Sequence, residues 1–239
     1  MVLPNVGEWE ISPDRTSLSG FALKYPFSGG WKPVGIGALV AVFTAFLLFP
    51  IIVLWGYRYR LSRAGARGDE SAPQFTNVGS IILNGLWLIL VFLPYILVVS
   101  VLAAVVAGIG SLHSGSAAIG VLLLWTFGAV YVGLAIHPTF VATGSVRRTY
   151  AGLLFLRVAV TRTYLVGFLI GLVLRFLVAI VVIMLLVISI ITIIGPFVVL
   201  FIWYAYDEFL PGAVWGHVAR DLSQQGLLPA VSPKDTLDL

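Results

Sequence analysis

The sequence predicts an all-α membrane protein, a polytopic helical bundle of about five transmembrane helices with amphipathic helices at the membrane interface. Apolar residues make up 60% of the 239 residues and charged residues only 10%. Soluble domains are about 45–50% apolar and about 25% charged. The apolar residues form continuous runs of the length that crosses a bilayer, about 20 residues. Because these runs do not alternate polar and apolar residues, we exclude the strands of a transmembrane barrel.

Residues 1–32 are expected to form a leader and a short amphipathic helix that lies in the membrane interface. A helix start is indicated at Ser12-Pro13, with serine as the N-cap and proline in the first turn. The helix is too short to span a bilayer, and its apolar residues share one face. That face consists of Leu18, Phe21, Ala22 and Tyr25.

Residues 33–222 are expected to form the transmembrane domain. Its first apolar run, 34–57, contains Pro50, which predicts a kink. Two alternatives stay open for this run: a single crossing, or a re-entrant hairpin with both ends on one side of the membrane. A loop is expected from residue 64 onwards.

Two further runs, 78–109 and 117–136, are separated by a short polar turn. The first of them contains Pro94 and exceeds one perpendicular crossing, so we expect it to tilt or kink. An interfacial segment rich in arginine follows at residues 144–163.

The longest run extends from Tyr164 to Tyr206, about twice the length of one crossing. Its strongest helix breaker is Gly195-Pro196, so we predict two helices that form a hairpin with its turn at 191–196. Beyond this run we expect a short helix broken at Pro211, and then a disordered tail at 223–239.

The distribution of arginine indicates the topology. Arginines are concentrated in the loops 58–77 and 138–163, whereas the turns at 110–116 and 191–196 contain no Lys or Arg. The positive-inside rule therefore predicts a multi-pass protein of the cell membrane with a cytoplasmic C-terminus. Five crossings would place the N-terminus outside, and the re-entrant alternative would place it inside.

Arg175 is the most unusual residue of the long run because a charge inside a membrane helix is costly and usually has a partner. We predict an intramembrane ion pair between Arg175 and Asp207 or Glu208 on the returning helix. The pair is either a static structural contact or a substrate or proton site.

Two other sets of residues are candidate contact sites. Arginines beside the apolar runs are expected to contact lipid headgroups. They are Arg58, Arg60, Arg147, Arg148 and Arg162. Gly167 and Gly171 form a GxxxG motif, which predicts close helix packing, either within the chain or in a dimer.

No catalytic, metal or cofactor site is predicted. The chain has no cysteine, and the spacing of His113, His137 and His217 fits no zinc motif. Neither a nucleophile motif nor a phosphate-binding loop is present. The positive charge is accounted for by lipid contact, so nucleic acid is not an expected partner.

Several motifs resemble the family called domain of unknown function 4013, integral membrane proteins of archaea and bacteria. The residues that carry the resemblance are Tyr25-Pro26-Phe27, Gly56-Tyr57, Arg58, Gly68, Pro73, Phe75 and Gly85-Leu86, with the closing segment WGHVARDL at 215–222. Where the family often has an acidic or aromatic cluster after the proline, this chain has Gln74-Phe75-Thr76-Asn77. The resemblance implies a membrane fold and no particular activity.

The expected function is that of a non-enzymatic scaffold or accessory subunit of a membrane assembly. Its expected partners are membrane lipids and either a second copy of the chain or another membrane protein. The alternative is a transporter or channel that uses a polar site around Arg175 and Asp207. An intramembrane enzyme is the weakest of the three classes, because no set of catalytic residues is evident.

Overall fold

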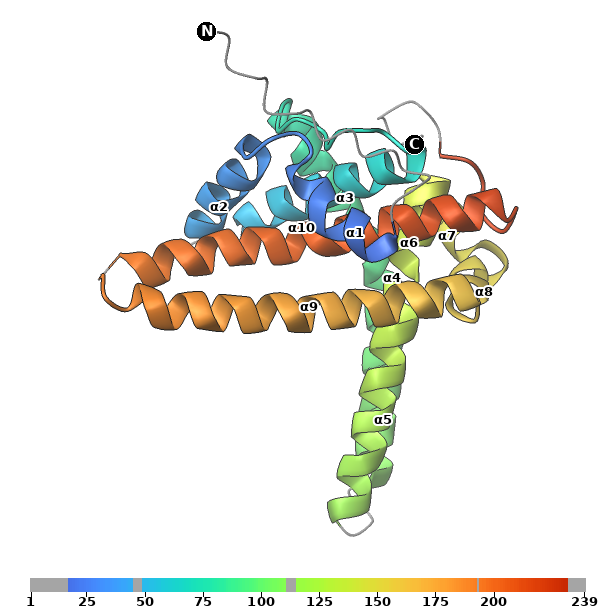
Figure 1. Cartoon of the computed structure of the whole chain (residues 1–239). Helices are drawn as coiled ribbons and strands as arrows, with labels where there is room; N and C mark the ends of the chain where they lie inside the picture. The colour runs from blue at the N-terminus through green and yellow to red at the C-terminus, as the bar shows by residue number, and fades with distance from the viewer. Residues whose placement is uncertain (1–16, 45–48, 111–114, 193, 232–239) are drawn as a thin grey trace, which may run out of the picture.

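The computed structural model describes residues 17–44, 49–110, 115–192 and 194–231, which form helices and no strands (Figure 1). The elements in chain order are α1 (Leu18–Lys24), η1 (Tyr25–Phe27), α2 (Lys32–Thr44), α3 (Phe49–Arg67), α4 (Val78–Gly110), α5 (Gly115–Leu134), α6 (Ile136–Thr143), α7 (Val146–Tyr150), η2 (Ala151–Leu153), α8 (Leu154–Ala159), α9 (Arg162–Ser189) and α10 (Gly195–Gln224). The expected helix start at Ser12-Pro13 lies outside the described residues.

Four stretches of these described residues are long and apolar enough to cross a membrane, which agrees with an all-α membrane bundle. They are Val78–Gly108, Ile119–Thr143, Arg162–Ser189 and Gly195–Gln224. The sequence predicted about five crossings, one more than the four candidate spans found among the described residues. The additional crossing was expected in the first apolar run, where α2 and α3 are separate helices that contact each other.

Helix α10 lies at the centre of the body, where it contacts α1, α2, α3, α6 and α9 (Figure 1). Two glycines permit its close approach to α3. A Cβ atom on Gly216 would lie 2.5 Å from the carbonyl oxygen of Ser62, and one on Gly212 would lie 3.0 Å from that of Arg58. Larger residues at these positions would push the two helices apart.

Helices α3 and α4 also cross at glycines, one on each helix. A Cβ atom on Gly56 would overlap the carbonyl oxygen of Ile81, and one on Gly85 would overlap that of Ile52. Both glycines belong to the motifs that carry the family resemblance. Their role in this fold is therefore backbone contact between two helices.

Helices α9 and α10 form the predicted hairpin. The amide of Gly195 donates a 3.0 Å hydrogen bond to Thr192 Oγ1 in the turn, and Pro196 is in the first turn of α10, where its missing amide is tolerated. The GxxxG glycines face α10 within the same chain. A Cβ atom on Gly167 would collide with Val218 Cγ2, whereas one on Gly171 would lie 3.6 Å from Val214 Cγ1.

Helices α4 and α5 form a second hairpin, which projects away from the body in a different direction from the α9–α10 hairpin (Figure 1). Tyr95 and Ala129 join the two helices through a 2.6 Å hydrogen bond from the Tyr95 hydroxyl to the Ala129 carbonyl. Few of the apolar side chains of α4 are buried within the chain. Leu124 of α5, for example, is 77% exposed, and such faces suit a lipid environment.

The expected interfacial helix is covered by protein. Phe21, Ala22 and Tyr25 of the predicted apolar face are buried, and α1 contacts α9 and α10. The sequence pattern identified an apolar face correctly but could not indicate whether lipid or protein covers it.

Three predicted boundaries are wrong. Helix α3 continues to Arg67, beyond the expected start of the loop at residue 64. Helix α10 runs unbroken through Pro211 to Gln224. The tail does not begin at residue 223, because Leu228 is buried and Ser223 Oγ donates a 2.9 Å hydrogen bond to the carbonyl of Pro229.

Candidate functional site: two ion pairs and a cavity

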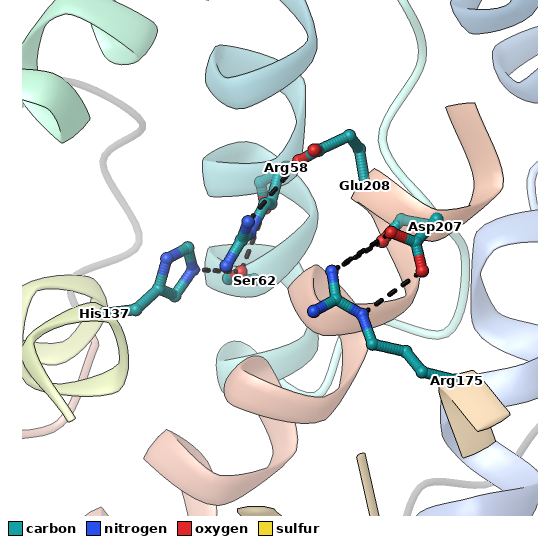
Figure 2. Close-up of polar contacts among 6 residues, drawn as sticks. All are labelled: Arg58, Ser62, His137, Arg175, Asp207 and Glu208. Atoms are coloured by element: carbon teal, nitrogen blue, oxygen red, sulfur yellow. Dashed lines mark hydrogen bonds and ion pairs between the residues drawn. The ribbon is translucent and has the colours of Figure 1, made fainter. Parts of the chain in front are cut away.

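Charged and polar side chains from four helices meet near the middle of α10 (Figure 2). Helix α3 contributes Arg58 and Ser62, α6 contributes His137, α9 contributes Arg175, and α10 contributes Asp207 and Glu208. The close approach of α3 and α10 at glycine brings these residues together from distant parts of the sequence.

Arg175 and Asp207 form an ion pair across the α9–α10 hairpin. Arg175 Nε lies 3.2 Å from Asp207 Oδ1, and Arg175 Nη2 donates a 3.2 Å hydrogen bond to Asp207 Oδ2. The side chains are 42% and 30% exposed, so the pair lies at the surface of the helix bundle. Asp207 and Glu208 were the two predicted partners of Arg175, and the ion pair is formed with Asp207.

Arg175 also donates to the main chain of Asp207. Its Nη2 atom lies 3.3 Å from the Asp207 carbonyl oxygen. In an unbroken helix this carbonyl would accept from the amide of residue 211, but Pro211 has no amide hydrogen. The guanidinium of Arg175 thus takes the place of a missing helical hydrogen bond, which explains how α10 continues through Pro211.

Glu208 pairs with Arg58 instead of Arg175. Arg58 Nη1 lies 3.4 Å from Glu208 Oε2, and the two side chains are only 13% and 15% exposed. Burial lowers the pKa of Arg58 below its usual value; Glu208 opposes this shift, and the charge of nearby Arg175 adds to it. Arg58 remains charged, because a guanidinium has a very high pKa and this one has a carboxylate partner.

A buried polar contact lies beside the two ion pairs. Ser62 Oγ and His137 Nε2 are 2.8 Å apart, and Ser62 Oγ also donates a 2.9 Å hydrogen bond to the Arg58 carbonyl. Ser62 and His137 thus join α6 to α3.

The arginines predicted to contact lipid headgroups differ in their surroundings. Arg58 is buried against Glu208 instead of lying at an exposed position beside the apolar runs. Arg60 donates to the Thr76 carbonyl at 2.6 Å and to Ser80 Oγ at 3.0 Å. Exposed positions are found for the other three, Arg147, Arg148 and Arg162.

A cavity of about 180 Å³ adjoins the ion pairs. Helices α5, α9 and α10 line it with mainly apolar side chains, and the charged side chains in its lining are Arg58 and Arg175. The lining thus consists of apolar side chains and the guanidinium groups of two arginines.

The motif residues of the family resemblance stabilise the loop that follows α3. Tyr57 donates a 2.8 Å hydrogen bond to the Pro73 carbonyl, and its ring stacks on Phe75 with centroids 4.7 Å apart. Tyr25 donates to the Ser71 carbonyl at 3.4 Å. Tyr25 and Tyr57 therefore hold a loop in place, whereas Arg58 of the same set of motif residues belongs to an ion pair.

No group of three or more His, Asp or Glu residues in the described part of the chain could hold a metal ion. His137 contacts Ser62, His217 Nε2 lies 3.6 Å from Asp221 Oδ2, and His113 is outside the described residues. Ser62 and the partnership of Arg58 with Glu208 were missed from the sequence. A signal was available, since two adjacent carboxylates at 207–208 require two cations and Arg175 supplies one.

No curated protein and no solved structure matches the chain significantly. One family profile does match, over residues 39–187, more than half of the sequence. The match includes α3, α4 and most of α9, and the family is described as "Protein of unknown function (DUF4013)". The chain belongs to this family of proteins of unknown function.

Proposed function

We propose that the protein is a non-enzymatic scaffold or accessory subunit of a membrane assembly. The observation that carries this proposal is the α4–α5 hairpin, whose apolar side chains are mostly exposed and which projects from the body (Figure 1). A long hairpin that packs little against its own chain offers two helix faces to neighbouring membrane proteins.

The composition of the hairpin favours helix association. Membrane helices associate by close van der Waals packing, and glycine allows two backbones to approach. At Gly120 and Gly128 of α5, an added Cβ atom would meet nothing within 4 Å. The open space beside these glycines would let a partner helix approach α5 closely.

Photo-crosslinking from native membranes tests the proposal. A photoreactive amino acid at Leu124, which is 77% exposed on α5, is expected to give one predominant protein adduct that mass spectrometry identifies. The matched control is Val160, which is 86% exposed but lies between α8 and α9. Adducts to lipid alone, or the same mixture of proteins from both positions, would contradict the proposal.

A transporter or channel is the second candidate function, because the cavity beside Arg175 and Arg58 provides a charged recess. Transport would require the Arg175–Asp207 pair to open as a substrate passes. In sealed liposomes, a channel would dissipate an imposed ion gradient, and Arg175→Gln would change the rate. A gradient that persists in the presence of the protein would support the scaffold.

A further inference from the structure

We propose that the cavity between α5, α9 and α10 binds an anionic phospholipid, with its phosphate at Arg58 and Arg175 and an acyl chain between α5 and α9. The inference does not depend on whether the protein is a scaffold or a transporter. It rests on the shape of the cavity, the charges that line it and a buried donor without a partner.

The cavity has a closed floor and an apolar mouth. Residues of α10, including Leu210 and Val214, form the floor and are almost completely buried. On the other side, Phe127 of α5 is 61% exposed and Leu172 of α9 is 51% exposed. The opening is therefore lined by side chains that suit hydrocarbon, which favours an occupant with an alkyl chain over a small water-soluble anion.

The volume indicates how much of a lipid enters. Pockets for drug-sized ligands are about 300–1,000 Å³, and this cavity is about 180 Å³. It therefore accommodates a headgroup or part of one chain, with the rest of the lipid remaining in the bilayer beside α5 and α9.

The charged groups that line the cavity are cationic. The guanidinium side chains of Arg58 and Arg175 line it, whereas their ion-pair partners Glu208 and Asp207 are not part of the lining. Each arginine is thus paired with a carboxylate, while the charged groups in the lining itself are the two guanidiniums. A phosphate between the two arginines would be attracted by both and would relieve their mutual repulsion.

One donor at this position lacks a partner. Arg58 Nε is buried and makes no hydrogen bond to any described residue. A buried unsatisfied donor is costly, so a ligand oxygen at this point would stabilise the protein. Headgroup phosphates supply acceptor oxygens of this kind.

Fluorescence quenching by brominated lipids tests the proposal. Trp215 lines the cavity, and the difference between the wild type and Trp215→Phe isolates its signal from the other tryptophans. The protein is reconstituted into phosphatidylcholine vesicles that contain a fixed fraction of either brominated phosphatidylglycerol or brominated phosphatidylcholine. We expect phosphatidylglycerol to quench Trp215 more strongly, and equal quenching by the two lipids would overturn the proposal.

Two variants of the cavity sharpen the test. The double variant Arg58→Gln, Glu208→Gln removes one cation together with its partner and is expected to weaken the preference for phosphatidylglycerol about fivefold. Gly171→Leu fills the cavity without changing any charge and is expected to abolish the preference.

The matched control is Arg148→Gln, which removes an exposed arginine of α7 that does not line the cavity. The control should keep the preference of the wild type. If Arg148→Gln weakens the preference as much as the cavity variants do, the lipid is attracted by overall charge and the proposed site is refuted. Should the double variant fail to fold, the wild-type comparison and Gly171→Leu still decide the question.

Discussion

Arg175 on α9 donates to both the carboxylate and the main-chain carbonyl of Asp207 on α10 (Figure 2). The second acceptor is available because Pro211 cannot donate to it. An arginine within an apolar run is a candidate for a substrate site, and this one also completes a helix at a proline and joins the two arms of a hairpin. The Arg175–Asp207 pair therefore contributes to helix stability as well as to the adjoining cavity.

We predict that Arg175 and Pro211 are energetically coupled. Arg175→Gln should lower the free energy of unfolding by about 1–3 kcal/mol, because it leaves the Asp207 carboxylate and carbonyl without their donor. In a Pro211→Ala background the alanine amide can reach the carbonyl, so the same change should cost less, with a coupling energy of about 1 kcal/mol. Thermal unfolding of the four variants in detergent measures this cycle. Additive effects would show that the carbonyl contact contributes nothing.

A second prediction concerns the crossing of α3 and α4. Gly85→Ala should destabilise the fold by about 1–3 kcal/mol or more, because its Cβ atom would overlap the Ile52 carbonyl oxygen on a backbone that cannot easily move. Gly79→Ala on the same helix is the control, since the nearest atom to its Cβ is 4.0 Å away. Equal melting temperatures for the two variants would argue against the close crossing.

The apolar runs and the Gly195-Pro196 turn were sufficient to predict the helical hairpins, because hydrophobicity along the chain is a local property. The contacts between helices were not predictable in the same way. Arg58 follows an apolar run, the usual place for a headgroup contact, but its partner Glu208 lies 150 residues away. Pro211 was expected to end a helix, because the rule for proline assumes that no side chain replaces its missing hydrogen bond. The missed partner of Arg58 and the expected break at Pro211 have the same cause, since a distant arginine or carboxylate decides the outcome and sequence spacing cannot reveal it.

A third prediction separates the two glycines of the GxxxG motif. Gly167→Ala should lower stability by about 1–2 kcal/mol, because Val218 must move, whereas Gly171→Ala should be tolerated at a 3.6 Å contact. Neither variant should alter the oligomeric state, which light scattering in detergent reports. A dimer face would instead make both substitutions change the oligomeric mass.

The last prediction concerns how the α9–α10 hairpin lies in the bilayer. Its two ends meet at one side, where Gln225 Nε2 donates a 2.9 Å hydrogen bond to Thr163 Oγ1, and Thr192 is at the turn. Exposed apolar residues surround much of α9, including Ile183, Met184 and Leu185 at consecutive positions, and a helix lying in the interface would instead show a polar face. We therefore expect α9 to cross the membrane and to place Thr192 opposite Thr163 and Gln225.

The absence of native cysteine allows single-cysteine variants to test this orientation in whole cells. A membrane-impermeant maleimide should label Thr192→Cys directly, and should label Thr163→Cys and Gln225→Cys only after permeabilisation, since we also expect a cytoplasmic C-terminus. Labelling of Thr192→Cys and Thr163→Cys from the same side would mean that the hairpin lies along the membrane surface. Because the α4–α5 hairpin points in a different direction (Figure 1), that result would leave α4 and α5 as the pair that crosses the bilayer.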